Sequence, residues 1–390
     1  MDNPLKTERL YEKDAYCREF SAKVISCEKE DEIYNVVLDK TAFFPEGGGQ
    51  SADTGTLNGI EVVDVQLLGD TVVHKVKENF PVGSEVVGKL NFDIRFRRMQ
   101  NHSGEHVLSG IVHSLFGYNN VGFHMSRTEM TVDFDGVLTA ENIEEVERRA
   151  NYAVYKNLPI SVSYPSTEES EHLEYRSKLD NIENLRLVTI GDIDCCACCA
   201  PHVLSTGEIG MIKVIDSTPN KGGTRLTVIA GFDAFSDYSM LNRENKKLMK
   251  TLSVSRNLVS DAADKQLELI NQLRYQNAEL SKRLAWAELS PITLDKCILA
   301  FSKDLSYDEL RHCANMLMEK DEKMCLLFST SDEGNYIYVV SSKTEDTRPV
   351  VKALNEAFSG KGGGKPNYAQ GKIVSDSEDK IKAFAEKYYR

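Results

Sequence analysis

Two short segments of this chain contain side chains that often bind metal ions. The segment HSGEH places His102 and His106 four residues apart, and the segment 194–202, DCCACCAPH, contains four cysteines and a histidine. Residues four apart on a helix lie about one turn apart on the same face, so both imidazoles could bind one ion. Cys198 and His202 have the same spacing, and they could complete a tetrahedral His₃Cys set suited to zinc.

The cysteines could also form a site by themselves, from Cys195, Cys196, Cys198 and Cys199. Neighbouring cysteines do not easily direct both sulfurs at one ion, so we expect the site with three histidines instead.

The histidine pair permits a second chemistry. His102-Ser-Gly-Glu105-His106 matches H-x-x-E-H, the inverted zinc-peptidase motif in which the glutamate is the general base. A distant carboxylate would then be the third ligand, and the cysteines would have no role. A peptidase also leaves the glycine-rich segments at both ends of the chain unexplained, so this interpretation ranks second.

Composition is that of a soluble globular protein of the cytoplasm. The 390 residues are 41% hydrophobic, without an apolar leader or a run of about eighteen apolar residues, so we expect no membrane association. The nine cysteines then indicate reduced thiols or metal ligands. A net charge of −13 disfavours a wide basic face for nucleic acid but allows a local basic patch.

The chain is expected to be a multi-domain α+β protein. Residues 1–90 contain short alternating runs separated by turn residues, which predicts a small β-barrel, with a sandwich as the alternative. Their loop FFPEGGGQSADTG contains Gly47, Gly48 and Gly49, which permit positive φ or the close approach of a ligand.

Residues 91–235 predict an α+β core that holds both metal-binding segments. Helical periodicity spans 93–118 and ends at Gly117, and the segment 124–136 indicates a strand. An amphipathic helix follows, with Thr139 as its cap.

Residues 236–290 predict a long helix or helical hairpin. Ile270, Leu273, Leu280 and Leu284 have heptad spacing, with Asn277 at a core position, a pattern typical of a coiled-coil contact in a homodimer. The alternative is a helix that packs on its own domain.

Residues 291–390 predict a compact α/β domain. Its helix 306–320 begins with a capping box, and its segment GKGGGKPNYAQGK predicts a glycine-rich loop flanked by Lys361 and Lys365. The amides of Gly362, Gly363 and Gly364 suit contact with phosphate. A flexible surface loop is the alternative.

Four segments in order, TAFFPEGGGQSADTG, RRMQNHSGEHVLSG, CCAPHVLSTGEIG and GKGGGKPNYAQGK, resemble one known family. They are similar to the editing domain of alanyl-tRNA synthetase and its following DHHA1 domain, and above all to the freestanding alanyl-tRNA editing proteins of the AlaX type. The β region begins within the first twenty residues, so we expect no amino-acid activation domain and no aminoacylation.

The resemblance implies hydrolysis of the ester that joins a wrong amino acid, serine chiefly and glycine as a second substrate, to tRNA(Ala). It implies zinc bound by His102, His106, Cys198 and His202, either catalytic or structural. Thr41 and Gln50 would bind the serine hydroxyl or position water, and Glu105 would be the base or a partner of His102. Gly47, Gly48 and Gly49 would contact substrate, and the stretch from Lys361 to Lys365 would bind tRNA.

One departure from the family lies in the metal-binding segment. The usual C-G-G-T-H is here Cys198-Cys199-Ala200-Pro201-His202, which removes both glycines and an amide donor. Cys195, Cys196 or Cys199 could therefore replace Cys198 as the ligand. A tRNA-binding factor without hydrolytic activity remains a further alternative.

Overall fold

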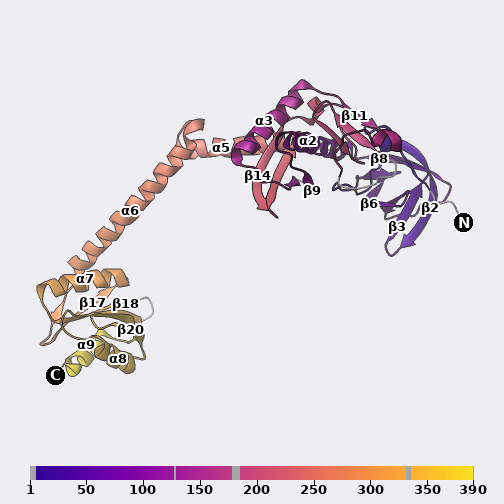
Figure 1. Cartoon of the computed structure of the whole chain (residues 1–390). Helices are drawn as coiled ribbons and strands as arrows, with labels where there is room; N and C mark the ends of the chain where they lie inside the picture. Colours follow the sequence, from indigo (N-terminus) through magenta and orange to yellow (C-terminus); the bar gives the residue numbers. More distant parts are fainter. Residues whose placement is uncertain (1–5, 127–128, 178–184, 331–334, 390) are drawn as a thin grey trace. The chain divides into compact units, whose positions relative to one another are not determined.

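The computed structural model describes residues 6–126, 129–177, 185–330 and 335–389. They form two compact units, Met1–Lys247 and Leu248–Arg390, called unit 1 and unit 2 below (Figure 1). Contacts between residues therefore place the two predicted domains 1–90 and 91–235 in the same unit. The division of the chain into four domains stays a prediction. Among the residues that the structure describes, none of the helices combines the length and apolarity that a membrane crossing requires.

Unit 1 begins with a sheet that closes on itself. Each of its six strands pairs with a neighbour on both sides, in the order β2-β3-β7-β6-β5-β8. The strands are β2 (Glu19–Glu30), β3 (Ile33–Leu38), β5 (Gly55–Leu57), β6 (Ile60–Leu68), β7 (Thr71–Val76) and β8 (Glu85–Leu90). Their alternate apolar residues form one core cluster in which Val36, Val65 and Val72 are fully buried. Before and beside this sheet lie β1 (Glu8–Arg9), α1 (Leu10–Lys13) and β4 (Lys40–Thr41).

The central helix of unit 1, α2 (Phe92–Phe116), follows β8 directly (Figure 1). Asn91 caps its first turn, and Gly117 ends it with a left-handed φ of +72°, a conformation that favours glycine. The predicted helix and its stop are therefore confirmed. Every residue from Met99 to Val112 is buried, so this stretch of α2 is enclosed by neighbouring elements.

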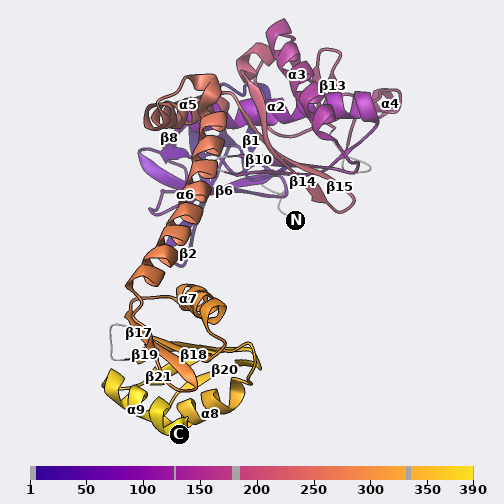
Figure 2. The same ribbon diagram turned by 90° about the vertical axis from the view of Figure 1, so that its left-hand side faces the viewer.

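Two further sheets of unit 1 accompany α2 (Figure 2). One has the order β14 (Ile212–Asn220), β15 (Gly223–Ala230), β10 (Met130–Phe134), β9 (Asn120–Met125), and the other β11 (Ile160–Ser163), β12 (Leu187–Ile190), β13 (Asp194–Ala197). The remaining elements are α3 (Ala140–Lys156), α4 (Thr167–Ser170) and η1 (Thr206–Ile209), and α5 (Phe232–Leu252) begins in unit 1 and ends in unit 2. Thr139 forms the predicted cap of α3. The single strand predicted over 124–136 is wrong: β9 ends and β10 begins within it, and residues 127–128 lie outside the described part.

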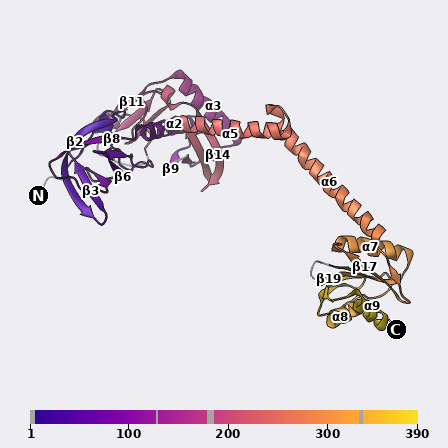
Figure 3. The same ribbon diagram turned by 180° about the vertical axis from the view of Figure 1, so that it is seen from behind.

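Unit 2 contains η2 (Arg256–Leu258), the 30-residue α6 (Val259–Glu288) and a six-stranded mixed sheet (Figure 3). The sheet order is β16 (Ile292–Thr293), β17 (Cys297–Lys303), β18 (Met324–Thr330), β19 (Asn335–Ser341), β21 (Tyr368–Val374), β20 (Lys361–Lys365). α7 (Tyr307–Lys320) lies on one face, and α8 (Arg348–Ala357) and α9 (Glu378–Tyr388) lie on the other (Figure 2). The capping box of α7, Ser306 with Glu309, is confirmed.

The predicted glycine-rich loop in unit 2 is wrong. Lys361–Lys365 forms β20, an exposed edge strand that pairs antiparallel with β21. A Cβ on Gly364 would lie 2.2 Å from the Tyr368 carbonyl oxygen, and one on Gly362 would lie 2.2 Å from the Tyr338 hydroxyl. The glycines of β20 therefore leave room for the close pairing of β20 with β21, and they do not form a flexible turn.

One buried ion pair fastens α2 to the closed sheet. Arg95, fully buried in the first turns of α2, donates from Nε to both carboxylate oxygens of Asp53 at 3.0 and 2.9 Å. It also donates to the carbonyl oxygens of Ala15 at 2.9 Å and Ala42 at 2.6 Å. Asp53 in turn accepts the Phe44 amide at 2.7 Å. The pair thus holds the segment 42–53, which contains the glycine-rich loop, against the helix.

Removing the charge of Asp53 should destabilise unit 1 strongly. Asp53→Asn leaves Arg95 buried without a counter-ion, which costs about 3–5 kcal/mol. Asp133→Asn is the matched control, because it breaks the half-exposed pair with Arg225 and costs about 0–1 kcal/mol. Urea unfolding followed by far-ultraviolet circular dichroism measures the difference. The single tryptophan, Trp286, lies in unit 2, so the fluorescence of the folded protein should be the same in both variants as in the unmodified chain. Equal midpoints for the two variants would contradict this role.

Candidate functional site

The structure brings together four side chains that the sequence singles out. His102 and His106 lie on α2, and Cys198 and His202 lie just after β13. One ligand atom from each residue forms a group whose members all lie within 4.8 Å of one another. The three histidines are at most 4% exposed. Below, these four residues are called the His/Cys cluster.

Each imidazole of the cluster makes a hydrogen bond through Nδ1 to a side chain outside it. The pairs are His102 with Gln50 Oε1 at 2.9 Å, His106 with Asp194 Oδ2 at 3.0 Å, and His202 with Ser103 Oγ at 3.0 Å. An amide or carboxylate oxygen can only accept, so His102 and His106 carry their proton on Nδ1 when neutral. Their Nε2 lone pairs are then free to bind an ion.

The donor set fits a metal ion. Cys198 Sγ lies 3.6 Å from His102 Nε2 and 3.3 Å from His202 Nε2, so the thiol shares one centre with the imidazoles. Burial alone would raise the pKa of the Cys198 thiol, but the imidazoles of His102 and His202 outweigh it and hold that pKa well below the usual value. Three imidazoles and one thiolate, with acceptors on the outer nitrogens, suit a tetrahedral first-row metal.

Asp194 connects the cluster to β13. Besides accepting from His106, its carboxylate accepts two hydrogen bonds from Arg176, at 2.7 and 2.8 Å. Gly110 of α2 makes the approach possible, since a Cβ there would lie 2.5 Å from the Ile193 carbonyl oxygen and 2.8 Å from Asp194 Cβ. Because Gly110 has no side chain, β13 can approach α2 closely enough for Asp194 to bind His106.

The other cysteines of the segment differ from Cys198 in their surroundings. Cys195 Sγ accepts from the Thr189 hydroxyl at 3.5 Å, and Cys199 is exposed. Cys196 belongs to a second group with His106 and Asp194, but burial raises the pKa of its thiol to about 11. A protonated thiol is a poor ligand, so the surroundings favour Cys198 as the thiolate.

The glycine-rich loop of unit 1 is a tight turn docked on β9. Residues 47–50 close it with two backbone hydrogen bonds of 3.0 Å, and Gly48 and Gly49 have φ values of +59° and +80°. Two successive positive φ values are characteristic of a type I′ turn and favour glycine. The Gly49 carbonyl accepts the Met125 amide at 2.9 Å, and a Cβ on Gly49 would lie 2.6 Å from the Phe123 carbonyl oxygen.

Docking of this turn carries Gln50 into the interior. Its side chain is 1% exposed, and its Oε1 holds His102. In the part of the chain that the structure describes, its Nε2 is buried without a hydrogen-bond partner. An unsatisfied amide donor beside the His/Cys cluster is available for a ligand.

Glu105 lies beside the cluster on α2, where it is 4% exposed. Its Oε1 accepts from the Ser109 hydroxyl at 2.5 Å and from Asn120 Nδ2 at 2.6 Å. Its other oxygen, Oε2, lies 3.9 Å from His106 Nε2, on the side of the cluster. One carboxylate oxygen is therefore fixed and the other is directed toward the metal-binding atoms.

Thr41 lies in a different environment from the cluster. Its hydroxyl is 2.8 Å from His74 Nε2 and accepts the Phe43 amide at 3.1 Å. His74 binds the Val36 carbonyl through Nδ1 at 3.1 Å, so its Nε2 is the acceptor and Thr41 the donor. Burial lowers the pKa of His74 to about 4, so this imidazole is neutral. The Thr41 oxygen keeps one lone pair for a further donor.

Sequence reasoning missed most of the residues that orient the cluster. These are Ser103, Ser109, Asn120, Arg176 and Asp194, together with His74 beside Thr41. Ser103 and Asp194 stand inside the two metal-binding segments, and that position was the available signal. The others lie elsewhere in the sequence, with no pattern of their own.

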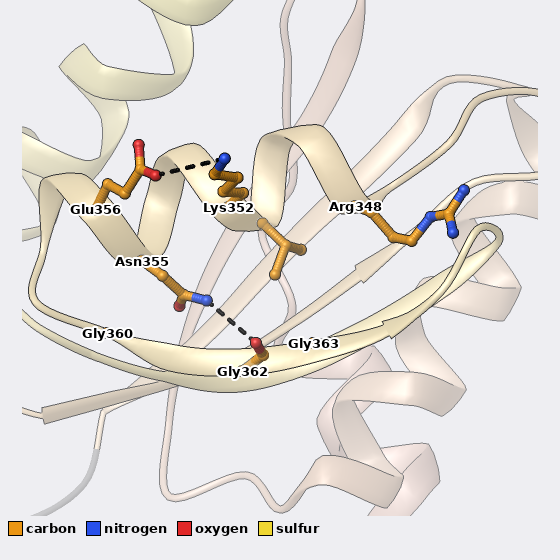
Figure 4. A pocket seen from close by; sticks show the side chains of 8 residues that line it. Arg348, Lys352, Asn355, Glu356, Gly360, Gly362 and Gly363 are labelled. Carbon is orange, nitrogen blue, oxygen red and sulfur yellow. Dashed lines mark hydrogen bonds and ion pairs between the residues drawn. The ribbon is translucent and has the colours of Figure 1, made fainter.

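In unit 2, α8 and β20 line a cavity of about 320 Å³ (Figure 4). Its lining includes Arg348 and Lys352 from the helix and Gly362 and Gly363 from the strand. Asn355 spans the two elements by donating to the Gly362 carbonyl at 3.2 Å. All residues of β20, the two flanking lysines among them, are exposed.

Three family models match successive parts of the chain. Residues 12–94 match tRNA synthetases class II (A), residues 185–227 match the threonyl and alanyl tRNA synthetase second additional domain, and residues 294–390 match the DHHA1 domain. The second of these contains Cys198 and His202.

Two similar proteins extend over nearly the same length as this chain. Alanyl-tRNA editing protein AlaX-L of Pyrococcus horikoshii is 27% identical over 95% of this chain and 96% of its own. Alanyl-tRNA editing protein Aarsd1 of Rattus norvegicus is 25% identical over 94% of both. This chain is a homologue of the AlaX-type alanyl-tRNA editing proteins. Both relatives are named as proteins that edit alanyl-tRNA. The alanine–tRNA ligase of Pyrococcus furiosus is also similar, at 30% identity over 94% of this homologue but only 42% of the ligase.

Metal content should depend on Cys198 and on the outer partner Asp194. Cys198→Ser removes the thiolate and should abolish stoichiometric metal, and Asp194→Asn should weaken affinity about 10–100-fold. Cys195→Ser is the control and should retain the metal. Elemental analysis and titration with a chromophoric chelator measure content and affinity. Loss of metal in Cys196→Ser but not in Cys198→Ser would show that the ligand is assigned wrongly.

Proposed function

We propose that this chain hydrolyses the ester of mischarged tRNA(Ala), chiefly with serine and secondarily with glycine as the wrong amino acid. The observation that carries the proposal is the buried His/Cys cluster beside Glu105 and Gln50, in a homologue of the alanyl-tRNA editing proteins. The homology suggests the substrate, and the cluster supplies groups able to act on an ester.

Zinc is the metal that we propose for the cluster, held by His102, His106, Cys198 and His202. When bound there, zinc would supply Lewis-acid chemistry or would hold the site together as a structural ion. Gln50, Asp194 and Ser103 maintain the orientation of the three imidazoles in either role.

Glu105 is the proposed general base. Ser109 and Asn120 hold its Oε1, which leaves Oε2 as the oxygen that can take a proton from the attacking water. This oxygen lies 3.9 Å from His106 Nε2, so it would be close to a water that attacks the ester if the cluster binds the tRNA end.

Gln50 and Thr41 are proposed to bind the two ends of the aminoacyl group, the ester carbonyl oxygen and the serine hydroxyl. The free Nε2 of Gln50 would donate to the ester carbonyl oxygen, where negative charge develops during attack. Thr41 donates to His74 and can therefore only accept from a substrate, which matches the hydroxyl proton of serine. Alanine has no hydroxyl group, so correctly charged tRNA would lose this contact. Gly47, Gly48 and Gly49 form the turn that positions Gln50.

The zinc-peptidase interpretation expects a carboxylate as the third ligand. Beside His102 and His106, the structure instead has Cys198 and His202, and the nearby Asp194 binds His106 through Nδ1. These positions favour the editing reaction.

The edge strand β20 is the proposed tRNA contact in unit 2. Lys361 and Lys365 are exposed at its two ends, and the glycines between them leave the backbone accessible. Two cations on this exposed edge strand could bind phosphates, although the net charge of the whole protein is −13. The adjacent Arg348 and Lys352 of α8 are each paired with a carboxylate, Asp346 and Glu356, so among the described residues of α8 and β20 the free cations are the two lysines of β20.

Deacylation is tested directly with the purified chain and seryl-, glycyl- and alanyl-tRNA(Ala), with and without chelator. We expect turnover of seryl-tRNA, slower turnover of glycyl-tRNA and little of alanyl-tRNA. Glu105→Gln should lower kcat on seryl-tRNA about 10²–10⁴-fold at unchanged metal content, as loss of a general base does. Glu61→Gln, on the exposed face of β6, is the matched control.

Three outcomes would contradict this proposal. Absence of turnover with all three substrates, together with tight tRNA binding, would indicate a binding factor. Cleavage of a protein substrate that is lost in Glu105→Gln would indicate the peptidase. Full activity in Glu105→Gln would remove the carboxylate from the mechanism.

A second copy of the chain is the proposed partner of α6. Ile270, Leu273, Leu280 and Leu284 are between 43% and 62% exposed, and among the described residues only Ala285 of this helix is buried. The predicted heptad stripe is therefore uncovered within its own unit. An apolar stripe on a helix of about 45 Å suits a coiled coil, and Asn277 within it would fix the register.

Sedimentation equilibrium should give a mass twice the 43.7 kDa of one chain. Leu273→Asp with Leu280→Asp should give the monomer, since two charges would be buried at the contact. Tyr275→Asp introduces a charge at a 70% exposed position off the stripe and should leave the dimer intact. A monomer in the unmodified chain, or a dimer that survives the double substitution, would contradict this contact.

A further inference from the structure

A second cavity of unit 2 lies on the opposite face of the sheet from α8. Its volume is about 430 Å³, within the range of small-ligand sites. α7 contributes Arg311, Asn315 and Met318, which are four and three residues apart and so lie along one stripe of the helix. The rest of the lining comes from the end of β19 and the start of β21: Ser341, Ser342, Lys343, Asn367 and Tyr368.

Ser341 is the first indication that this cavity binds a ligand. It is 1% exposed, and its hydroxyl oxygen is buried without a hydrogen-bond partner in the described part of the chain. A buried hydroxyl without a partner destabilises the folded chain, because it loses its hydrogen bonds to water. A polar ligand in the cavity would satisfy this group.

Two exposed cations, Arg311 and Lys343, line the cavity. The Asp308 carboxylate on α7 interacts electrostatically with Arg311, but among the described residues neither cation forms an ion pair within 4.0 Å. The Arg311 guanidinium is held over the Tyr368 ring, 4.6 Å from its centroid. Ser342 fixes the loop that carries Lys343, because its hydroxyl accepts the amides of Thr344 and Glu345 at 3.3 and 3.0 Å. The Arg311 side chain is therefore pre-positioned for an anion, and the backbone that carries Lys343 is held at the same cavity.

The rest of the lining suits a flat, polar group. Asn315 and Asn367 each offer a donor and an acceptor, the combination that pairs with the edge of a nucleobase. Met318 and Tyr368 provide apolar and aromatic surface. A guanidinium fixed on an aromatic ring presents its N–H groups in a planar fork that matches phosphate.

We propose that this cavity binds one nucleotide unit, a phosphate together with its base. Arg311 and Lys343 hold the phosphate, and Asn315, Asn367 and Ser341 bind the base. The unit is either a nucleotide of bound RNA or a free mononucleotide. Only the first source rests on the proposed function.

Binding is measured on the whole chain by calorimetric titration with AMP, GMP, CMP, UMP and inorganic phosphate. At least one nucleotide should bind ten times more tightly than phosphate. Arg311→Ala and Lys343→Ala should each weaken that binding at least tenfold. Lys387→Ala, at an exposed position of α9 on the other face of the sheet, is the matched control and should bind nucleotide normally. Thermal unfolding verifies that Arg311→Ala is folded, and Lys343→Ala should fold normally because the Lys343 side chain is exposed.

The source of the nucleotide follows from the affinity of the same variants for a tRNA(Ala) transcript. If Arg311→Ala weakens tRNA binding and the mononucleotide competes with tRNA, the occupant is a nucleotide of RNA. If tRNA binding is unchanged, the occupant is a free nucleotide. Lack of saturable nucleotide binding, equal affinity for phosphate, or binding unaffected by both substitutions would each overturn the inference. None of these measurements requires deacylation, so they can fail independently of the proposed function.

Discussion

The hydrogen bonds at the outer nitrogens of three buried imidazoles determine how unit 1 must be built. An imidazole has only two nitrogens, so directing Nε2 at a common centre requires a partner for each Nδ1. Those partners come from the glycine-rich turn, from α2 itself and from β13. The closed sheet, the helix and the β11-β12-β13 sheet therefore have to meet at one place, and unit 1 is the arrangement in which they do.

Small residues and one ion pair make this convergence possible. Gly49 and Gly110 remove side chains at the two points where backbone must approach closely. Arg95 and Asp53 then fasten the turn to the helix, through two buried hydrogen bonds between them and a third from Arg95 to the Ala42 carbonyl. A buried pair is a weak source of net stability, but it tolerates no change in the position of either partner. It is suited to holding Gln50 at a fixed distance from His102.

In unit 2 we propose contacts of a different kind, between an acidic protein and an anion. The cations proposed to make them are Lys361 and Lys365 of β20, and Arg311 and Lys343 at the cavity beside α7. Such local grouping allows contact with phosphate although the chain as a whole repels it. Glycines at the edge strand leave backbone groups accessible for the same purpose.

The sequence by itself determined the local features of this protein. The spacing of His102 and His106, the stop at Gly117 and the capping boxes depend on residues a few positions apart, so they could be predicted from pattern alone. The order of the four segments was also sufficient to predict the family. Only the tertiary structure decided which side chains meet across long stretches of chain. Gln50 and Asp194 are 52 and 88 residues from the histidines they hold, and no periodicity encodes such pairs. The tertiary structure also decided that Thr41 binds His74. It decided as well that the glycines beside Lys361 form a strand, because glycine fits both a free loop and two closely paired strands.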